Sequence, residues 1–136
     1  MTKTDADSSS GHNPYKGSRG LSHIWNATKN SWSGIVFAIR EESAFRQELT
    51  VTACGVPMAL LLPFGAVERL MLIGSLVLTL IVELLNSSVE AAIDRISLDH
   101  HGLSKRAKDY GSAAVTLSLL LCAMVWVTLT YRLFAG

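Results

Sequence analysis

Four side chains that can bind a cation or accept a proton recur at helical spacing in the second half of the chain. Glu83, Asn86, Glu90 and Asp94 follow one another at intervals of three, four and four residues. Residues three or four positions apart lie on one face of an α-helix, so these side chains form a polar stripe. An unpaired carboxyl inside an apolar run costs about 2.5 to 3.5 kcal/mol at the centre of a membrane helix. The stripe therefore predicts a functional site.

Two interpretations of this stripe are open on the residues alone. Its Asn and Glu side chains could hydrogen-bond to a neighbouring helix and hold the helices together. Three carboxyls on one stripe repel one another, however, which favours a bound cation such as Mg²⁺ or a bound proton. We therefore favour the functional interpretation, by the rule that ionisable groups inside a membrane serve function by default.

Phosphoryl transfer is the chemistry that needs carboxylates beside basic residues. Mg²⁺ binds one or two carboxylates together with phosphate oxygens, and lysine neutralises the remaining phosphate charge. Lys105, Arg106 and Lys108 supply positive charge soon after the stripe. The sequence contains neither GxxxxGK[ST] nor GxGxxG, so a nucleotide site here is neither a P-loop nor the glycine-rich loop of protein kinases.

The helix that carries the stripe is predicted to lie in a membrane. The chain has 136 residues, 49% of them hydrophobic, and its mean hydropathy of +0.33 is high for a soluble fold of this length. A helix needs ~20 residues to cross the hydrocarbon layer. Three apolar blocks meet this need: residues 44–63, 68–96 and 112–133. We therefore expect an all-α membrane protein with three transmembrane helices.

The chain before these blocks divides into two segments. Residues 1–20 are polar, with no apolar core, and predict a disordered tail. Residues 21–40 show helical spacing of apolar positions and predict an amphipathic surface helix. Such a helix could cover a soluble core, but Trp25 and Trp32 on its apolar face, beside membrane spans, favour a position in the membrane interface.

Charge and cysteine content exclude some classes of function. The formal net charge is +1 and no basic surface stands out, so we do not expect nucleic-acid binding. The two cysteines lie in apolar stretches without metal-ligand spacing, so neither a disulfide nor a zinc site is expected.

Basic residues gather before the first span and between the second and third, which predicts a cytoplasmic N-terminus.

Four sequence blocks carry a resemblance to a known family. They are ESAFRQE at 42–48, VELLNS at 82–87, EAAIDR at 90–95 and SKRAKDYGSAA at 104–114. With these blocks in this order, the chain resembles the prokaryotic diacylglycerol kinase family from residue 21 to its end. The resemblance implies that residues 21–136 form a membrane kinase domain that assembles as a homotrimer with active sites shared between subunits.

The resemblance also implies an activity and a set of site residues. The activity is ATP-dependent phosphorylation of diacylglycerol to phosphatidic acid at the cytoplasmic face of a bacterial inner membrane, with Mg²⁺ as cofactor. Glu83 is implied to be the general base, and Glu42 and Glu90 to hold the metal. The implied nucleotide-binding residues are Glu42, Asn86, Glu90, Asp99, His101, Lys108 and Asp109. The implied lipid contacts are Ala44, Phe45, Arg46, Gln47, Glu48, Glu83 and Ser112.

Two rival functions remain open. A kinase of the same fold could phosphorylate undecaprenol in place of diacylglycerol, since one sequence does not fix the lipid. A non-enzymatic proton or cation pathway could instead use Glu83, Glu90 and Asp94. Such a pathway should continue across the membrane, yet residues 70–82 offer only Ser75 and Thr79 as polar side chains, which disfavours it.

Overall fold

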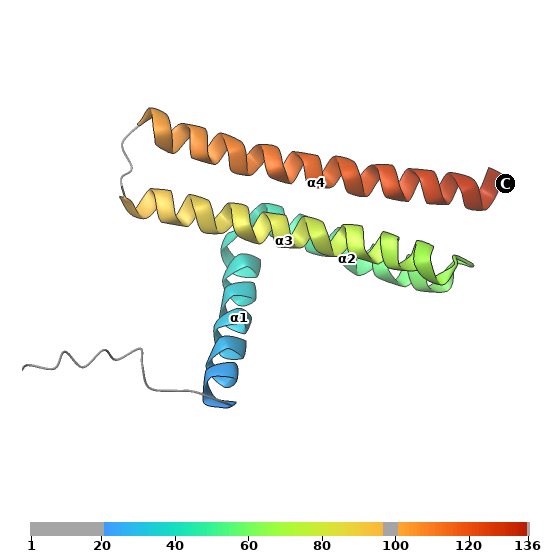
Figure 1. Cartoon of the computed structure of the whole chain (residues 1–136), viewed down its shortest axis with the longest axis horizontal. Helices are drawn as coiled ribbons and strands as arrows, with labels where there is room; N and C mark the ends of the chain where they lie inside the picture. Colours follow the sequence, from blue (N-terminus) through green and yellow to red (C-terminus); the bar gives the residue numbers. More distant parts are fainter. Residues whose placement is uncertain (1–20, 97–100, 136) are drawn as a thin grey trace, which may run out of the picture. The chain divides into compact units, whose positions relative to one another are not determined.

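The computed structural model describes residues 21–96 and 101–135, and every regular element in these ranges is an α-helix (Figure 1). In chain order the helices are α1 Leu21–Glu41, α2 Ser43–Leu61, α3 Ala66–Ile96 and α4 Gly102–Ala135. The expected all-helical fold is confirmed. The predicted tail, residues 1–20, lies outside the described residues. The chain forms two compact parts that meet between Gly34 and Ile35, and each is described by itself.

The described portion of the first part is the beginning of α1. Its large apolar side chains are exposed: Ile24 is 63%, Trp25 62% and Trp32 69% accessible. The Lys29 ammonium lies 5.4 Å from the centre of the Trp25 ring, within the range of a cation–π contact. Exposed Trp beside Lys is compatible with a helix that lies in the membrane interface, which stays a prediction.

The second part is built around α3, which packs against both α2 and α4 (Figure 1). Ala59, Phe64 and Leu72 form the buried centre of this packing. Trp126 of α4 lies against them and donates a hydrogen bond from its indole nitrogen to the Leu72 carbonyl at 3.3 Å. This centre lies near the turn that joins α2 to α3. The opposite end, where α3 ends and α4 begins, carries mostly polar residues.

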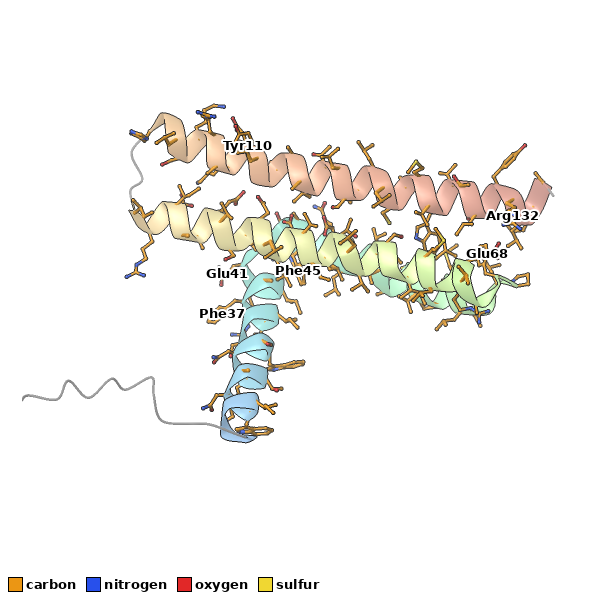
Figure 2. The ribbon with its side chains drawn as sticks, viewed as in Figure 1. Phe37, Glu41, Phe45, Glu68, Tyr110 and Arg132 are labelled. Atoms are coloured by element: carbon orange, nitrogen blue, oxygen red, sulfur yellow. The ribbon has the colours of Figure 1, made fainter. Side chains whose placement is uncertain are left out.

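Polar contacts fix the turn between α2 and α3. The Arg69 guanidinium donates hydrogen bonds to the carbonyls of Ala59 at 3.0 Å and Phe64 at 3.2 Å. These carbonyls lie near the C-terminal end of α2, where helix carbonyls lack partners within the helix. Glu68 forms an ion pair of 3.2 Å with Arg132 of α4, which joins the C-terminal end of α4 to the same turn (Figure 2).

Among the described helices, α3 and α4 are long and apolar enough to cross a membrane. Helix α2 has 19 residues and carries Arg46 and Glu48 in its first two turns. Helix α4 has 34 residues and joins the basic segment 103–110 to the predicted span 112–133 without a break. Gly111 lies at that junction, and one glycine costs a long helix only about 1 kcal/mol.

Candidate active site

The buried carboxyl of Glu83 is the centre of the candidate site. Glu83 is only 4% exposed and lies in the second half of α3. The carboxyls of Glu42 and Glu90 lie near enough for their charges to act on Glu83, and the charge of Glu83 in turn acts on Glu48 of α2. The fold therefore gathers four acidic side chains: Glu83 and Glu90 from α3, Glu48 from α2, and Glu42 from the junction of α1 and α2.

Glu42 reaches this cluster because α1 ends just before it. Glu42 is the single residue between α1 and α2, with extended backbone angles of φ −99° and ψ 112°. Side chains at this position often cap the following helix by a hydrogen bond. In the described structure the Glu42 carboxylate makes no such bond to α2. The carboxylate is therefore available as a ligand.

Asn86 and Glu90 interact along the stripe of α3. The Asn86 amide nitrogen donates a hydrogen bond to a Glu90 carboxylate oxygen at 3.2 Å. Both side chains are half-buried. The amide therefore fixes the orientation of the Glu90 carboxylate, and a ligand with a fixed orientation binds a metal with less loss of entropy.

Further along the stripe, α3 and α4 are joined by charge. The Lys108 ammonium lies 2.6 Å from the Asp94 carboxylate, and Lys105 lies 2.6 Å from Asp109. The hydrogen bond with Asp94 raises the pKa of Lys108 and so favours its protonated form. His101 accepts a hydrogen bond from the Leu103 backbone N–H at 3.2 Å through its Nδ1 atom.

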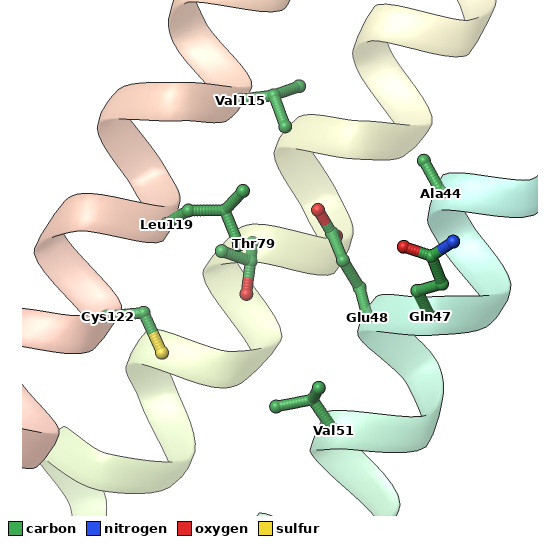
Figure 3. Close-up of a pocket in the computed structure, with 8 residues that line it drawn as sticks. All are labelled: Ala44, Gln47, Glu48, Val51, Thr79, Val115, Leu119 and Cys122. Carbon is green, nitrogen blue, oxygen red and sulfur yellow. The ribbon is translucent and has the colours of Figure 1, made fainter.

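A cavity of about 300 Å³ opens between α2, α3 and α4 (Figure 3). Its wall combines the polar side chains Gln47 and Glu48 with mainly apolar ones. The lining residues are Ala44, Gln47, Glu48, Val51, Thr79, Val115, Leu119 and Cys122. Thr79 lies one helical turn before Glu83, so the cavity adjoins the buried carboxyl. A volume of this order is at the lower end of ligand-binding pockets.

The implied lipid contacts do not all face this cavity. Ala44, Gln47 and Glu48 line it, whereas Phe45 is 3% exposed and packs inside the protein. The Arg46 guanidinium donates hydrogen bonds to the carbonyls of Ile39, at 3.2 Å, and Arg40, at 3.1 Å, near the end of α1. Arg46 thus stabilises the end of α1.

Two further predicted site residues are Ser112 and Asp99. Ser112 is exposed on α4, and its carbonyl accepts a hydrogen bond from the Thr116 hydroxyl at 3.0 Å. Asp99, an implied nucleotide contact, lies outside the described residues. The structure thus brings together Glu42, Glu83 and Glu90.

The acidic residues suit Mg²⁺ better than a metal held by protein ligands alone. Within residues 21–96 and 101–135, no group of three or more His, Cys, Asp or Glu side chains is arranged to hold a metal ion. Mg²⁺ in ATP-dependent enzymes needs only one or two carboxylates, because phosphates and water complete its octahedron. Glu42 and Glu90 lie near the same buried carboxyl, and carboxylate oxygens are the kind of ligand that Mg²⁺ prefers.

The sequence interpretation did not assign Thr79 and Cys122 to a site. Both line the cavity. Thr79 lies four residues before Glu83, so the helical spacing that defined the stripe also extends to it. Cys122 gave no such signal, because nothing in the sequence shows which face of a uniformly apolar helix meets α3.

A buried carboxyl, an ion-paired lysine and a nearby, mainly apolar cavity, carried by helices long and apolar enough to cross a membrane, are compatible with the class of integral membrane enzymes that act on lipids. The sequence profile described as "Prokaryotic diacylglycerol kinase" matches residues 29–130. The chain is 47% identical over 116 residues to the diacylglycerol kinase of Pseudomonas aeruginosa, covering 85% of this chain and 94% of that protein.

More distant relatives carry the same description. The diacylglycerol kinase of Escherichia coli is 42% identical over 115 residues, which cover 85% of this chain and 94% of that protein. That of Helicobacter pylori is 35% identical over 108 residues, covering 79% of this chain and 84% of that protein. The chain belongs to the prokaryotic diacylglycerol kinase family.

Proposed function

We propose that this protein transfers the γ-phosphoryl group of MgATP to the primary hydroxyl of diacylglycerol and so forms phosphatidic acid. The observation that carries the proposal is the position of buried Glu83 between two different environments. On one side lies the apolar cavity with Glu48 and Thr79 in its wall. On the other lie the Asn86–Glu90 pair and Lys108. A lipid hydroxyl and a nucleotide phosphate could meet between them.

In the proposed reaction Glu83 accepts the proton of the lipid hydroxyl. The hydroxyl oxygen then attacks the γ-phosphorus, the bond from that phosphorus to the β–γ bridging oxygen breaks, and ADP leaves. Lys108 neutralises charge on the phosphates, and Asn86 holds the Glu90 carboxylate in place. Glu42 and Glu90 would hold Mg²⁺, which, when bound with ATP, withdraws negative charge from the phosphate oxygens.

The membrane arrangement is part of the proposal. We infer three spans, with α2 joining α3 and α4, an interfacial α1, a cytoplasmic N-terminus in a bacterial inner membrane, and a homotrimer. The charge distribution supports this orientation, because the turn between α2 and α3 and the end of α4 offer only Arg69 and Arg132. Lys105, Arg106 and Lys108 lie at the other end of the helices, and the positive-inside rule assigns the end richer in Lys and Arg to the cytoplasm.

A proton or cation pathway is less well supported by the contacts inside α3. The Ser75 hydroxyl donates to the Leu72 carbonyl at 2.8 Å, and the Thr79 hydroxyl donates to the Leu76 carbonyl at 2.7 Å. Each hydroxyl thus makes its shortest hydrogen bond within its own helix, and the further contact of Ser75, at 3.5 Å, is with the sulfur of Cys122. They do not continue the acidic stripe as a path for ions.

The lipid acceptor is tested by transfer of radiolabelled phosphate. Purified protein in mixed micelles is given γ-labelled ATP with either diacylglycerol or undecaprenol. We expect label in phosphatidic acid and far less label in the polyprenol. A preference for undecaprenol would agree with the proposed phosphoryl transfer but would show that the lipid substrate is the polyprenol. ATP turnover that does not depend on added lipid would contradict the proposed lipid kinase activity.

A further inference from the structure

Gly111 of α4 lies where α4 comes closest to the side chain of Asn86. A Cβ atom added to Gly111 would overlap the Asn86 amide oxygen and would lie 3.2 Å from the Asn86 Cγ atom. The Asn86 amide therefore occupies the space that a side chain at position 111 would need. Its oxygen is buried and has no hydrogen-bond partner in the described structure, so the approach of Gly111 is the contact that confines this end of the amide.

The other end of the same amide holds Glu90. The Asn86 nitrogen donates to Glu90 at 3.2 Å, while its oxygen packs at Gly111. Because its oxygen is confined by Gly111 and its nitrogen is hydrogen-bonded to Glu90, the Asn86 side chain has one preferred rotamer. The position of α4 at Gly111 is in this way connected to the orientation of the Glu90 carboxylate on α3.

We propose that Gly111 is a positioning residue for the metal carboxylate. Because it has no side chain, Asn86 fits between α3 and α4, and through Asn86 the Glu90 carboxylate is fixed for the cation that accompanies ATP. The role of Glu90 rests on the proposed function, whereas the contact of Gly111 with Asn86 does not.

The Gly111→Ala substitution forces one of two changes. Either Asn86 rotates and loses its hydrogen bond to Glu90, or α4 moves away from α3. Partners that orient a metal ligand typically change metal affinity or activity by roughly 10- to 100-fold when they are removed. We therefore expect a rise of about tenfold or more in the Mg²⁺ concentration that gives half-maximal turnover at fixed ATP. A purely structural defect would lower the maximal rate without this shift.

Gly102→Ala is the matched control. Gly102 is on the same helix, and a Cβ added there meets no atom within 4 Å. This variant should keep the Mg²⁺ requirement and the thermal midpoint of the parent protein. An equal shift in both variants would indicate a general effect of alanine in α4 and would overturn the proposal.

A double-mutant cycle tests whether Gly111 acts through Asn86. The Asn86 Cβ atom would lie 3.8 Å from the added Cβ, an ordinary contact, so alanine at position 86 leaves room for alanine at 111. The Gly111→Ala substitution should therefore lower the thermal midpoint in detergent strongly in the parent background and little in the Asn86→Ala background. Recovery of folding in the double variant would support the contact even if Gly111→Ala alone does not fold.

Opposite results would overturn the inference. They are an unchanged Mg²⁺ requirement and midpoint in Gly111→Ala, or an equal loss of stability, including failure to fold, in the Asn86→Ala background. Failure of the proposed function looks different, because then the parent protein itself shows no lipid-dependent ATP turnover. The thermal cycle still reports on the Gly111–Asn86 contact in that case.

Discussion

At the scale of single residues, the burial of Glu83 is more readily explained by chemistry than by helix packing. A carboxyl removed from water is costly unless hydrogen bonds or opposite charge compensate it. The charges that act on Glu83 come from the carboxyls of Glu42, Glu90 and Glu48, and like charges raise that cost. A bound proton or cation relieves this repulsion, as a general base and a metal site require.

Glu83→Gln should keep the fold and remove nearly all turnover. The substitution preserves side-chain size but removes the proton acceptor, and general base catalysis contributes typically 10²- to 10⁴-fold. Labelled phosphate transfer to diacylglycerol measures the loss, and size-exclusion chromatography in detergent checks assembly.

Glu68→Gln is the matched control on the same helix. Glu68 pairs with Arg132 at the turn between α2 and α3, far along α3 from Glu83, so this variant should remain active. A folded Glu83→Gln variant with normal turnover would remove Glu83 from the role of base.

Asp94→Asn should shift the alkaline limb of the pH–rate profile to lower pH. The hydrogen bond to Asp94 raises the pKa of Lys108 above its usual value, so the protonated lysine is favoured up to a higher pH. Without the carboxylate the pKa returns toward its ordinary value, and Lys108 loses its charge earlier as pH rises. Turnover measured across alkaline pH tests this, with the neutral-pH rate as reference. An unchanged alkaline limb would show that Lys108 does not limit the rate there.

At the scale of elements, the packing of three helices depends on the absence of a side chain at Gly55. A Cβ atom added to this residue of α2 would lie 2.8 Å from Leu76 of α3 and 3.2 Å from the ring of Trp126 of α4. A side chain from each of the other two helices therefore lies within contact distance of Gly55. The cavity beside Glu83 is bounded by the same three helices.

Gly55→Ala should lower the free energy of unfolding by about 1 to 3 kcal/mol, the usual cost of overpacking a filled core. Leu76 and Trp126 must both move to accept the methyl group. Thermal unfolding in detergent micelles measures the effect. Gly74→Ala is the control, because a Cβ at Gly74 meets nothing within 4 Å, and its change should stay within about 1 kcal/mol. Equal thermal midpoints for the two variants would contradict the close packing of Leu76 and Trp126 against Gly55.

At the scale of the whole molecule, the two ends of the packed helices α2, α3 and α4 differ in the charged side chains that they carry. One end is closed by the turn between α2 and α3, with Arg69 on the carbonyls of α2 and Glu68 paired with Arg132. Toward the other end lie Glu90, Asp94 and Lys108. This polarity matches an enzyme that binds a water-soluble nucleotide at one membrane surface and takes its second substrate from the lipid.

Removal of residues 1–20 should leave lipid phosphorylation within about twofold of the full chain, because the segment is polar and has no apolar core. The comparison of full-length and truncated protein uses the same micelle assay and equal amounts of folded protein. A truncated protein that folds but loses most of its activity would assign the tail a role in the reaction.

The sequence by itself determined the helical class, the acidic stripe and the family. Periodicity and hydropathy are local properties, so the spacing from Glu83 to Asp94 placed these residues on one face before any packing was known. Only the tertiary structure decided what that face meets. Glu83 lies near Glu48, and Asp94 pairs with Lys108.

The tertiary structure also separated residues that one sequence block had grouped. Within residues 42–48, Glu48 lines the cavity, Phe45 is buried and Arg46 binds carbonyls of α1. Likewise, the roles of Gly55 and Gly111 depend on which helices approach them. A chain of apolar helices can pack in many registers with similar burial, and the close approach of particular atoms selects one of them.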